Sequence, residues 1–228
     1  MQTGKKAAST LATMYREEST VKLRRERTKA VRDELKQFPT GDTPDSCMSA
    51  PLRLNELETA LRNLKCIKAP GPDGICNDIL KHLGPKAKKT LLQLFNESWT
   101  SATVPAQWEK AFICPIHKKG KNKKDPKSYR PISLISCLGK LMERIINRRL
   151  IWHLEANNLL TPTQTGYRKH QNTEDQLAPL AQEIETSFQE KNKVVSMFFN
   201  LYRAFGKVWR EGLLLKVRQS GVTQRMFG

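Results

Sequence analysis

The chain has 228 residues and a formal net charge of +18, because 40 lysines and arginines face only 22 acidic residues. This length suits one domain with an extension, and no run of about 18 apolar residues is present to span a membrane. The N-terminus lacks the apolar core of a signal peptide, and the five scattered cysteines form no C-x-x-C pair. We therefore expect an intracellular protein, cytoplasmic or nuclear, with reduced thiols and no membrane partner.

Residues 1–50 are predicted to form a charged N-terminal extension followed by a linker. The part before residue 38 is dense in charge, and its apolar stripe is too thin to anchor a helix firmly. Residues 38–51 are rich in Pro, Gly, Ser and Asp, which is typical of a domain boundary. One domain is therefore expected over residues 51–228.

Apolar residues at helical spacing predict most of the elements after the linker. The predicted helices span residues 53–66, 86–100, 138–155, 173–190 and a last stretch from about 207. Pro179 lies inside the fourth helix and predicts a kink or a later start. Residues 111–117 and 194–201 are predicted to be strands, and the sequence KAPGPDGI at 68–75 a turn. The fold class is therefore α+β and rich in helix.

A run of cations follows the first predicted strand. Gly120 and Pro126 predict a loop or hairpin there, with a single acidic residue, Asp125. Mobile lysines suit phosphate as point charges, and an arginine can bind two phosphate oxygens at once. We favour phosphate contact over a merely solvated charge run, because apolar segments flank the loop. The cations are Lys118, Lys119, Lys121, Lys123, Lys124, Lys127 and Arg130.

Two further patterns carry weaker signals. In TQTGYRKH, Gly166 permits close backbone approach, while Gln164, Tyr167 and Arg168 suit hydrogen bonding to, or stacking on, a nucleotide. Cys114-x-x-His117 has the spacing of half a zinc site, but the other cysteines lack matching ligand spacing. No metal site is therefore predicted.

Together these motifs resemble one family. KAPGPDGI, then PIHKKGK and SYRPISLISCLGKLMERIINRRL, then QTGYR, then FFNLYRAFGKVW occur in an order and spacing that look like the reverse transcriptase of jockey-like non-LTR (LINE-type) retrotransposons. The resemblance covers residues 54 to 226. It implies a partial right-hand polymerase fold, with fingers over 51–190 and the start of the palm over 191–228.

The resemblance also implies roles for single residues. Lys118 and Arg130 match residues that hold the triphosphate of an incoming deoxynucleotide, and Phe205 matches the bulky residue that excludes a ribose 2′-hydroxyl. Gln164, Gly166 and Arg168 match a segment that lines the template and nucleotide pocket. Lys119, Lys121, Lys123, Lys124 and Lys127 would contact nucleic acid without sequence preference. The active family uses magnesium, an RNA template and a DNA product.

Two positions depart from the family's pattern. Asn200 stands where the family has a magnesium-binding Asp, and Gly206 where it has a second Asp. An amide oxygen brings no charge to a site that needs hard, charged ligands. The family's other two metal carboxylates belong to a Tyr-Ala-Asp-Asp hairpin expected beyond Gly228, so we expect an incomplete palm and no thumb. Hence no intact catalytic residue, no bound cofactor and weak or no deoxynucleotide binding are expected.

Several functions remain compatible with the sequence. The first is an inactive reverse transcriptase fragment that still binds RNA and DNA electrostatically through its basic fingers. The second is a decayed reading frame without function. A third is a non-enzymatic basic module that binds nucleic acid or another protein, and a fourth is an active polymerase completed by a separate chain. The oligomeric state is not predicted.

Overall fold

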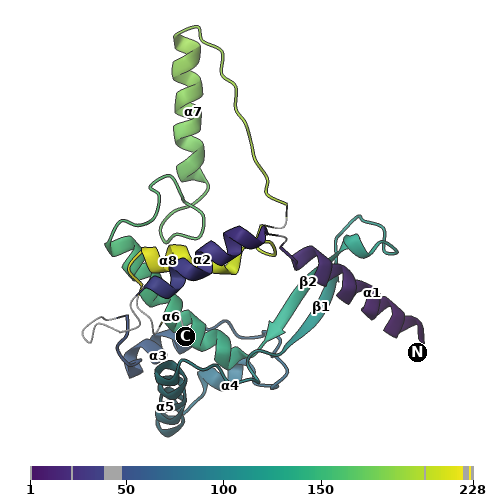
Figure 1. The fold of residues 1–228 in the computed structure, drawn as a ribbon, viewed down its shortest axis with the longest axis vertical. Coiled ribbons are helices and arrows are strands. Elements are labelled where there is room, and N and C mark those ends of the chain that lie inside the picture. The colour runs from purple at the N-terminus through teal and green to yellow at the C-terminus, as the bar shows by residue number, and fades with distance from the viewer. Residues whose placement is uncertain (1, 22, 39–47, 203, 223–225, 227–228) are drawn as a thin grey trace. The chain divides into compact units, whose positions relative to one another are not determined.

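A computed structural model of the chain describes residues 2–21, 23–38, 48–202, 204–222 and 226. The chain divides into two compact units, Met1–Trp152 with Phe205–Gly228, and His153–Ala204. The elements of the first unit that form the core are α3 (Leu54–Arg62), α4 (Asn77–Lys81), α5 (Pro85–Ser101) and α6 (Cys137–Ala156). These bounds confirm three of the predicted helices to within a few residues (Figure 1).

The core forms where the apolar faces of these helices meet. Apolar residues that recur at helical spacing within these helices are among the most buried in the described chain: Leu57, Leu61, Leu91, Phe95, Trp99, Leu141, Met142 and Ile145. Trp108 packs its ring edge against Phe95, with ring centroids 5.8 Å apart. Burying several large apolar side chains at about 1.5–3 kcal/mol each supplies the main driving force for this unit.

The turn at residues 68–75 packs directly on the backbone that leads into α6. A Cβ added to Gly71 would lie 2.5 Å from the carbonyl carbon of Ile135 and 2.6 Å from the amide nitrogen of Ser136. Only a residue without a side chain allows this approach. The Ser136 side chain in turn accepts hydrogen bonds from the N–H groups of Leu138 and Gly139 at the start of α6. The turn therefore fixes where α6 begins.

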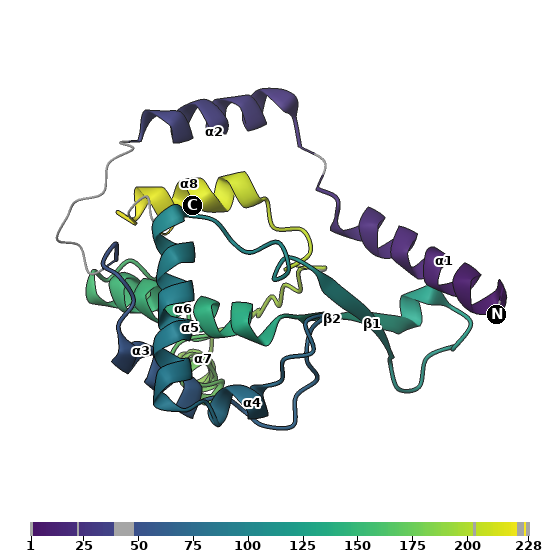
Figure 2. The ribbon, with the colours of Figure 1, turned by 90° about the horizontal axis from the view of Figure 1, so that it is seen from below.

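Two antiparallel strands form a hairpin, β1 (Ala111–His117) and β2 (Tyr129–Ile135), joined by a loop with the short helix η1 (Pro126–Ser128). The first strand was predicted with its exact bounds, whereas the second was not predicted. Pro115 lies opposite Pro131 in the register. Because the Lys118 N–H donates to the Ser128 carbonyl, the hydrogen-bonded pairs alternate from there and the two prolines fall at a non-hydrogen-bonded pair, where their missing N–H groups cost the ladder nothing. Both views show the hairpin reaching away from the core helices α3 to α6, and α1 lies beside its tip (Figures 1 and 2).

The charged N-terminal segment forms two helices, α1 (Gln2–Ser19) and α2 (Arg25–Gln37). No described residue of α2 is buried, as its thin apolar stripe indicated. Polar contacts hold α2 against α8 (Arg210–Gln219) instead, with Arg32 paired to Glu211 at 2.9 Å and the Arg27 guanidinium 5.5 Å from the Trp209 ring centre. The predicted linker falls largely on residues 39–47, which lie outside the described residues.

The second unit contains α7 (Glu174–Gln189), which confirms the fourth predicted helix. The helix runs through Pro179. None of its described residues is buried, and Leu177 and Phe188 are 55% and 66% exposed. None of the described helices is long and apolar enough to cross a membrane.

One prediction near the C-terminal end was wrong. Residues 194–201 form no strand, because no described segment pairs with their backbone, and Val195, Phe198 and Phe199 are 84–86% exposed. A strand needs a partner for its N–H and C=O groups. The last predicted helix is present as α8, which starts at Arg210 with Trp209 as its N-cap, and Gly206 lies in the turn before it.

Candidate nucleic-acid interface

The tip of the hairpin, residues 118–128, is ordered by hydrogen bonds to its own backbone. Lys118 N–H donates to the Ser128 carbonyl at 2.8 Å, and the Tyr129 hydroxyl donates to the Lys123 carbonyl at 2.9 Å. The Asp125 carboxylate accepts the N–H of Lys127 at 2.9 Å, which caps η1. The carboxylate of Asp125, the only acidic residue of the tip, therefore accepts a hydrogen bond from the backbone of the loop.

The lysine side chains of the tip project from this ordered loop. Lys119, Lys121, Lys123, Lys124 and Lys127 are all exposed, as is Arg130 in β2. None of these cations forms an ion pair with a described residue. Positive charges held close together without counter-ions make a surface suited to phosphate.

Lys118 and Arg130 lie on the same face of the hairpin. The register pairs Ile116 with Arg130, and Lys118 is two residues beyond Ile116, so its side chain has the same direction. The ammonium group of Lys118 is already bound, because it donates to the Lys127 carbonyl at 2.7 Å. In the described structure the Lys118 side chain therefore stabilises the loop, whereas Arg130 is exposed.

Cys114 and His117, which have the spacing of half a zinc site, do not come together in β1. Cys114 and His117 are three residues apart in one strand, so their side chains lie on opposite faces. His117 packs its ring against Tyr129 and contacts the Lys121 carbonyl at 3.0 Å. In the described part of the chain, no three His, Cys, Asp or Glu side chains gather in a way that would hold a metal ion.

In the second unit, Arg168 is committed to a structural contact. Its guanidinium donates to both carboxylate oxygens of Glu155, at 3.0 and 2.6 Å. It also donates to the carbonyls of Thr161 and Gln164, and the hydrogen bond with Glu155 raises the pKa of Arg168. The Gln164 amide donates to the Gly166 carbonyl at 3.3 Å. This motif therefore closes a compact turn in its own unit.

The remaining predicted residues lie on the chain between α7 and α8. Asn200 is exposed in the segment without regular structure, and Phe205 and Gly206 are exposed in the turn that follows it. Phe205 is 76% exposed. Lys118 and Arg130 belong to the first unit and Gln164, Gly166 and Arg168 to the second, so the nucleotide pocket that joins them stays a prediction.

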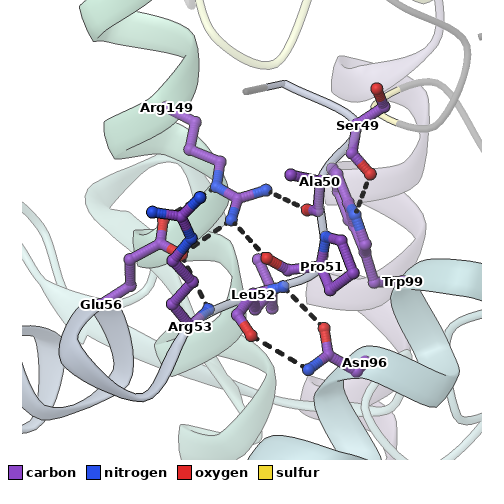
Figure 3. A network of polar contacts seen from close by, with 9 residues as sticks. All are labelled: Ser49, Ala50, Pro51, Leu52, Arg53, Glu56, Asn96, Trp99 and Arg149. Atoms are coloured by element: carbon purple, nitrogen blue, oxygen red, sulfur yellow. Dashed lines mark hydrogen bonds and ion pairs between the residues drawn. The ribbon is translucent and has the colours of Figure 1, made fainter. Parts of the chain in front are cut away.

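A polar network that the sequence did not reveal joins α3, α5 and α6 (Figure 3). Arg149 donates to both carboxylate oxygens of Glu56 and to the carbonyls of Ala50 and Pro51. The Asn96 side chain accepts a hydrogen bond from the Leu52 N–H at 2.7 Å and donates one to the Leu52 carbonyl at 3.0 Å. Burial alone would raise the pKa of Glu56, but the hydrogen bonds from Arg149 and from the Arg53 N–H, with the charges of both arginines, lower it below its ordinary value.

This network lies at one wall of a cavity of about 400 Å³ between α3 and α6. Arg53, Arg148 and Trp152 also line the cavity. The sequence signal for it was present but unused: Arg144, Arg148 and Trp152 recur every four residues, which places them along one face of a helix.

Comparison with known proteins shows which protein family this sequence matches. The family model described as reverse transcriptase (RNA-dependent DNA polymerase) matches residues 116–227, from the end of β1 past α8. This range contains the basic hairpin tip, the turn around Arg168 and the segment with Asn200. The chain thus carries a reverse transcriptase domain sequence.

Individual relatives from Drosophila melanogaster show which kind of reverse transcriptase the chain is similar to. The chain is 37% identical over 169 residues to the probable RNA-directed DNA polymerase from transposon BS, and 38% identical over 153 residues to that from transposon X-element. It is 34% identical over 175 residues to the RNA-directed DNA polymerase from mobile element jockey. These alignments cover 74%, 67% and 75% of the chain and 19%, 17% and 19% of the relatives. The chain belongs to the reverse transcriptases of jockey-like non-LTR retrotransposons and spans about a fifth of the length of these relatives.

Proposed function

We propose that this chain is the nucleic-acid-binding fingers portion and palm start of a non-LTR reverse transcriptase, and that it binds RNA or DNA phosphates through the basic hairpin. The observation that carries the proposal is the hairpin tip, where five exposed lysines and Arg130 form no ion pair with a described residue. The match to the reverse transcriptase family makes a nucleic acid the fitting polyanion. Such a protein acts inside the cell, in the cytoplasm or the nucleus.

The ordering of the tip supports this role. A mobile lysine run would have to lose backbone freedom on binding, whereas the hydrogen bonds of Lys118, Asp125 and Tyr129 have fixed the loop beforehand. The lysine heads keep their rotamer freedom, which suits contacts to a phosphate backbone of any sequence. We therefore expect binding without strong sequence preference.

The test is the salt dependence of binding to a 20-nucleotide RNA. If about five phosphates are neutralised, a plot of log K against log salt has a slope of about −3 to −4 for a single strand. That slope should become clearly flatter when alanine replaces Lys119, Lys121, Lys123, Lys124 and Lys127, while the contact of Lys118 with the Lys127 carbonyl stays in place. The control removes equal charge elsewhere, by alanine at Lys65, Lys68, Lys81, Lys86 and Lys89, which are all exposed. If both variants keep the slope of the unchanged chain, the hairpin is not the binding surface.

The second part of the proposal concerns Asn200. By family resemblance it occupies the place of a magnesium-binding Asp, and its neutral amide withholds one charged metal ligand. Two metal ions that must stabilise the attacking and leaving oxygens would be held poorly without it. We propose that this substitution disables nucleotidyl transfer while the basic hairpin still binds nucleic acid.

A further inference from the structure

The cavity between α3 and α6 combines positive charge with an exposed aromatic ring. Among the described residues that line it, Glu56 alone is acidic, and Arg149 and the Arg53 N–H already satisfy its carboxylate (Figure 3). Arg149 is itself largely buried, with 9% of its side chain exposed. The charges that remain for a ligand at the cavity are therefore those of Arg53 and Arg148, both exposed and without an ion pair to any described residue.

Trp152 completes the cavity at the α6 wall. Its side chain is 58% exposed, whereas Trp99 in the core of the same unit is 3% exposed. Each of Arg144, Arg148 and Trp152 is four positions after the one before it. They therefore follow one another along one face of α6, about 6 Å apart along its axis. Arg144 is anchored by donation to the Asn63 carbonyl at 2.8 Å, just after the end of α3.

We propose that this cavity is a second nucleic-acid site, in which an unpaired base stacks on Trp152 and the flanking phosphates contact Arg53 and Arg148. An aromatic face beside cations is how proteins hold single strands without reading their sequence. A base within a duplex is stacked on its neighbours and does not present its face, so the site selects unpaired strands of RNA or DNA. The inference rests on the proposed function in taking nucleic acid as the polyanion, but it assigns different residues.

The Arg149 network makes the site rigid. Arg149 ties the carbonyls of Ala50 and Pro51 to α6, and the Arg53 N–H is fixed on Glu56. Both walls of the cavity are thereby held in one unit before a ligand arrives, which lowers the entropy cost of binding. The protein supplies a prepared surface for the base.

The experiment measures binding of the full chain to three labelled probes at fixed low salt: a 20-nucleotide U strand, a 20-nucleotide dT strand and a 20-base-pair duplex. Trp152→Ala should weaken binding of both single strands by about 5- to 100-fold and leave duplex binding unchanged. Trp152→Phe should retain most of the affinity, because a phenyl ring still stacks. Arg148→Ala should weaken binding of all three probes. The U and dT probes show whether the site separates RNA from DNA.

Quenching of tryptophan fluorescence gives an independent readout. The U strand should quench the unchanged chain, and this quenching should largely disappear in Trp152→Phe. If Trp152→Ala binds single strands as tightly as the unchanged chain does, or loses duplex binding to the same extent, base stacking on Trp152 is wrong while hairpin binding stands. If the unchanged chain binds none of the probes, the proposed function fails as well.

Discussion

Arg149 in α6 and Glu56 in α3, 93 residues apart in the sequence, form a two-pronged ion pair. The Arg149 Nε donates to Oε1 at 2.8 Å and Nη2 donates to Oε2 at 2.7 Å. The same guanidinium lies 5.8 Å from the ring centre of Trp99 and binds two backbone carbonyls before α3. Arg149 therefore links α3, α6 and the segment that precedes α3 through polar contacts, in addition to the apolar core that they share.

Arg149→Met should destabilise the first unit by about 2–4 kcal/mol, because it leaves the half-buried Glu56 carboxylate without its charged partner and two carbonyls without the Arg149 donor. The free energy of unfolding in urea measures this. Arg148→Ala, one residue earlier and exposed, is the matched control and should change stability by less than about 0.5 kcal/mol. Equal stability of the two variants would show that the network contributes nothing.

The ion pair also predicts a pH dependence. The folded pKa of Glu56 lies below its ordinary value of 4.5, so its stabilisation is complete above that pH and is lost as the pH falls through the folded value. The difference in unfolding free energy between the unchanged chain and Glu56→Gln should be constant from pH 7 to about 5 and shrink below 4.5. Comparison with the Gln variant cancels the other carboxylates. A difference that grows toward low pH would contradict the assignment.

Gly71→Ala tests the contact between the turn and the start of α6. A methyl group there would meet backbone atoms of Ile135 and Ser136 at 2.5–2.7 Å, and backbone cannot rotate away as a side chain does. We expect a loss of about 1–3 kcal/mol, seen as a lower midpoint of thermal unfolding. Gly4→Ala in α1 has nothing within 4 Å and should be neutral or slightly stabilising. A neutral Gly71→Ala would show that the two segments are not packed as described.

Arg168 should behave as a structural residue of its turn. Arg168→Lys cannot reproduce the paired hydrogen bonds to Glu155, because an ammonium group lacks the planar fork of a guanidinium. Hydrogen exchange of the amides of Gln164 and Arg168, which donate within this turn, should accelerate several-fold in that variant. Unchanged exchange rates would show that the contact with Glu155 does not stabilise the turn. The role in the template and nucleotide pocket that the family resemblance implies would then be favoured.

The sequence predicted the features of this fold that depend on neighbours in the chain. Leu57 with Leu61, and Phe95 with Trp99, are one helical turn apart, so periodicity alone identified the buried faces. Gly71 was recognised as part of a turn, but its contact with Ile135 depends on tertiary packing. The Arg149–Glu56 pair joins distant segments, so no local pattern indicated it.

The errors have physical causes too. Residues 194–201 have the composition of a strand, yet a strand forms only beside a partner, and the described residues provide none. The second strand was missed because Pro131 interrupts its pattern. The contact of Arg168 with Glu155, thirteen residues earlier, was not predicted either, because the motif alone does not show it, and the pocket role of Arg168 stays a prediction.

The claim that Asn200 withholds polymerase chemistry is tested most directly in a full-length relative. Residues 51–228 replace the aligned segment of the jockey polymerase, and extension of a primer on an RNA template is measured with magnesium. The chimera should show only background extension, and Asn200→Asp should raise its rate by about a hundredfold or more, since a metal ligand supplies several kcal/mol of transition-state stabilisation. Gly206→Asp alone should leave extension at background. Equal extension by the chimeras with Asn200 and with Asp at that position would contradict the claim.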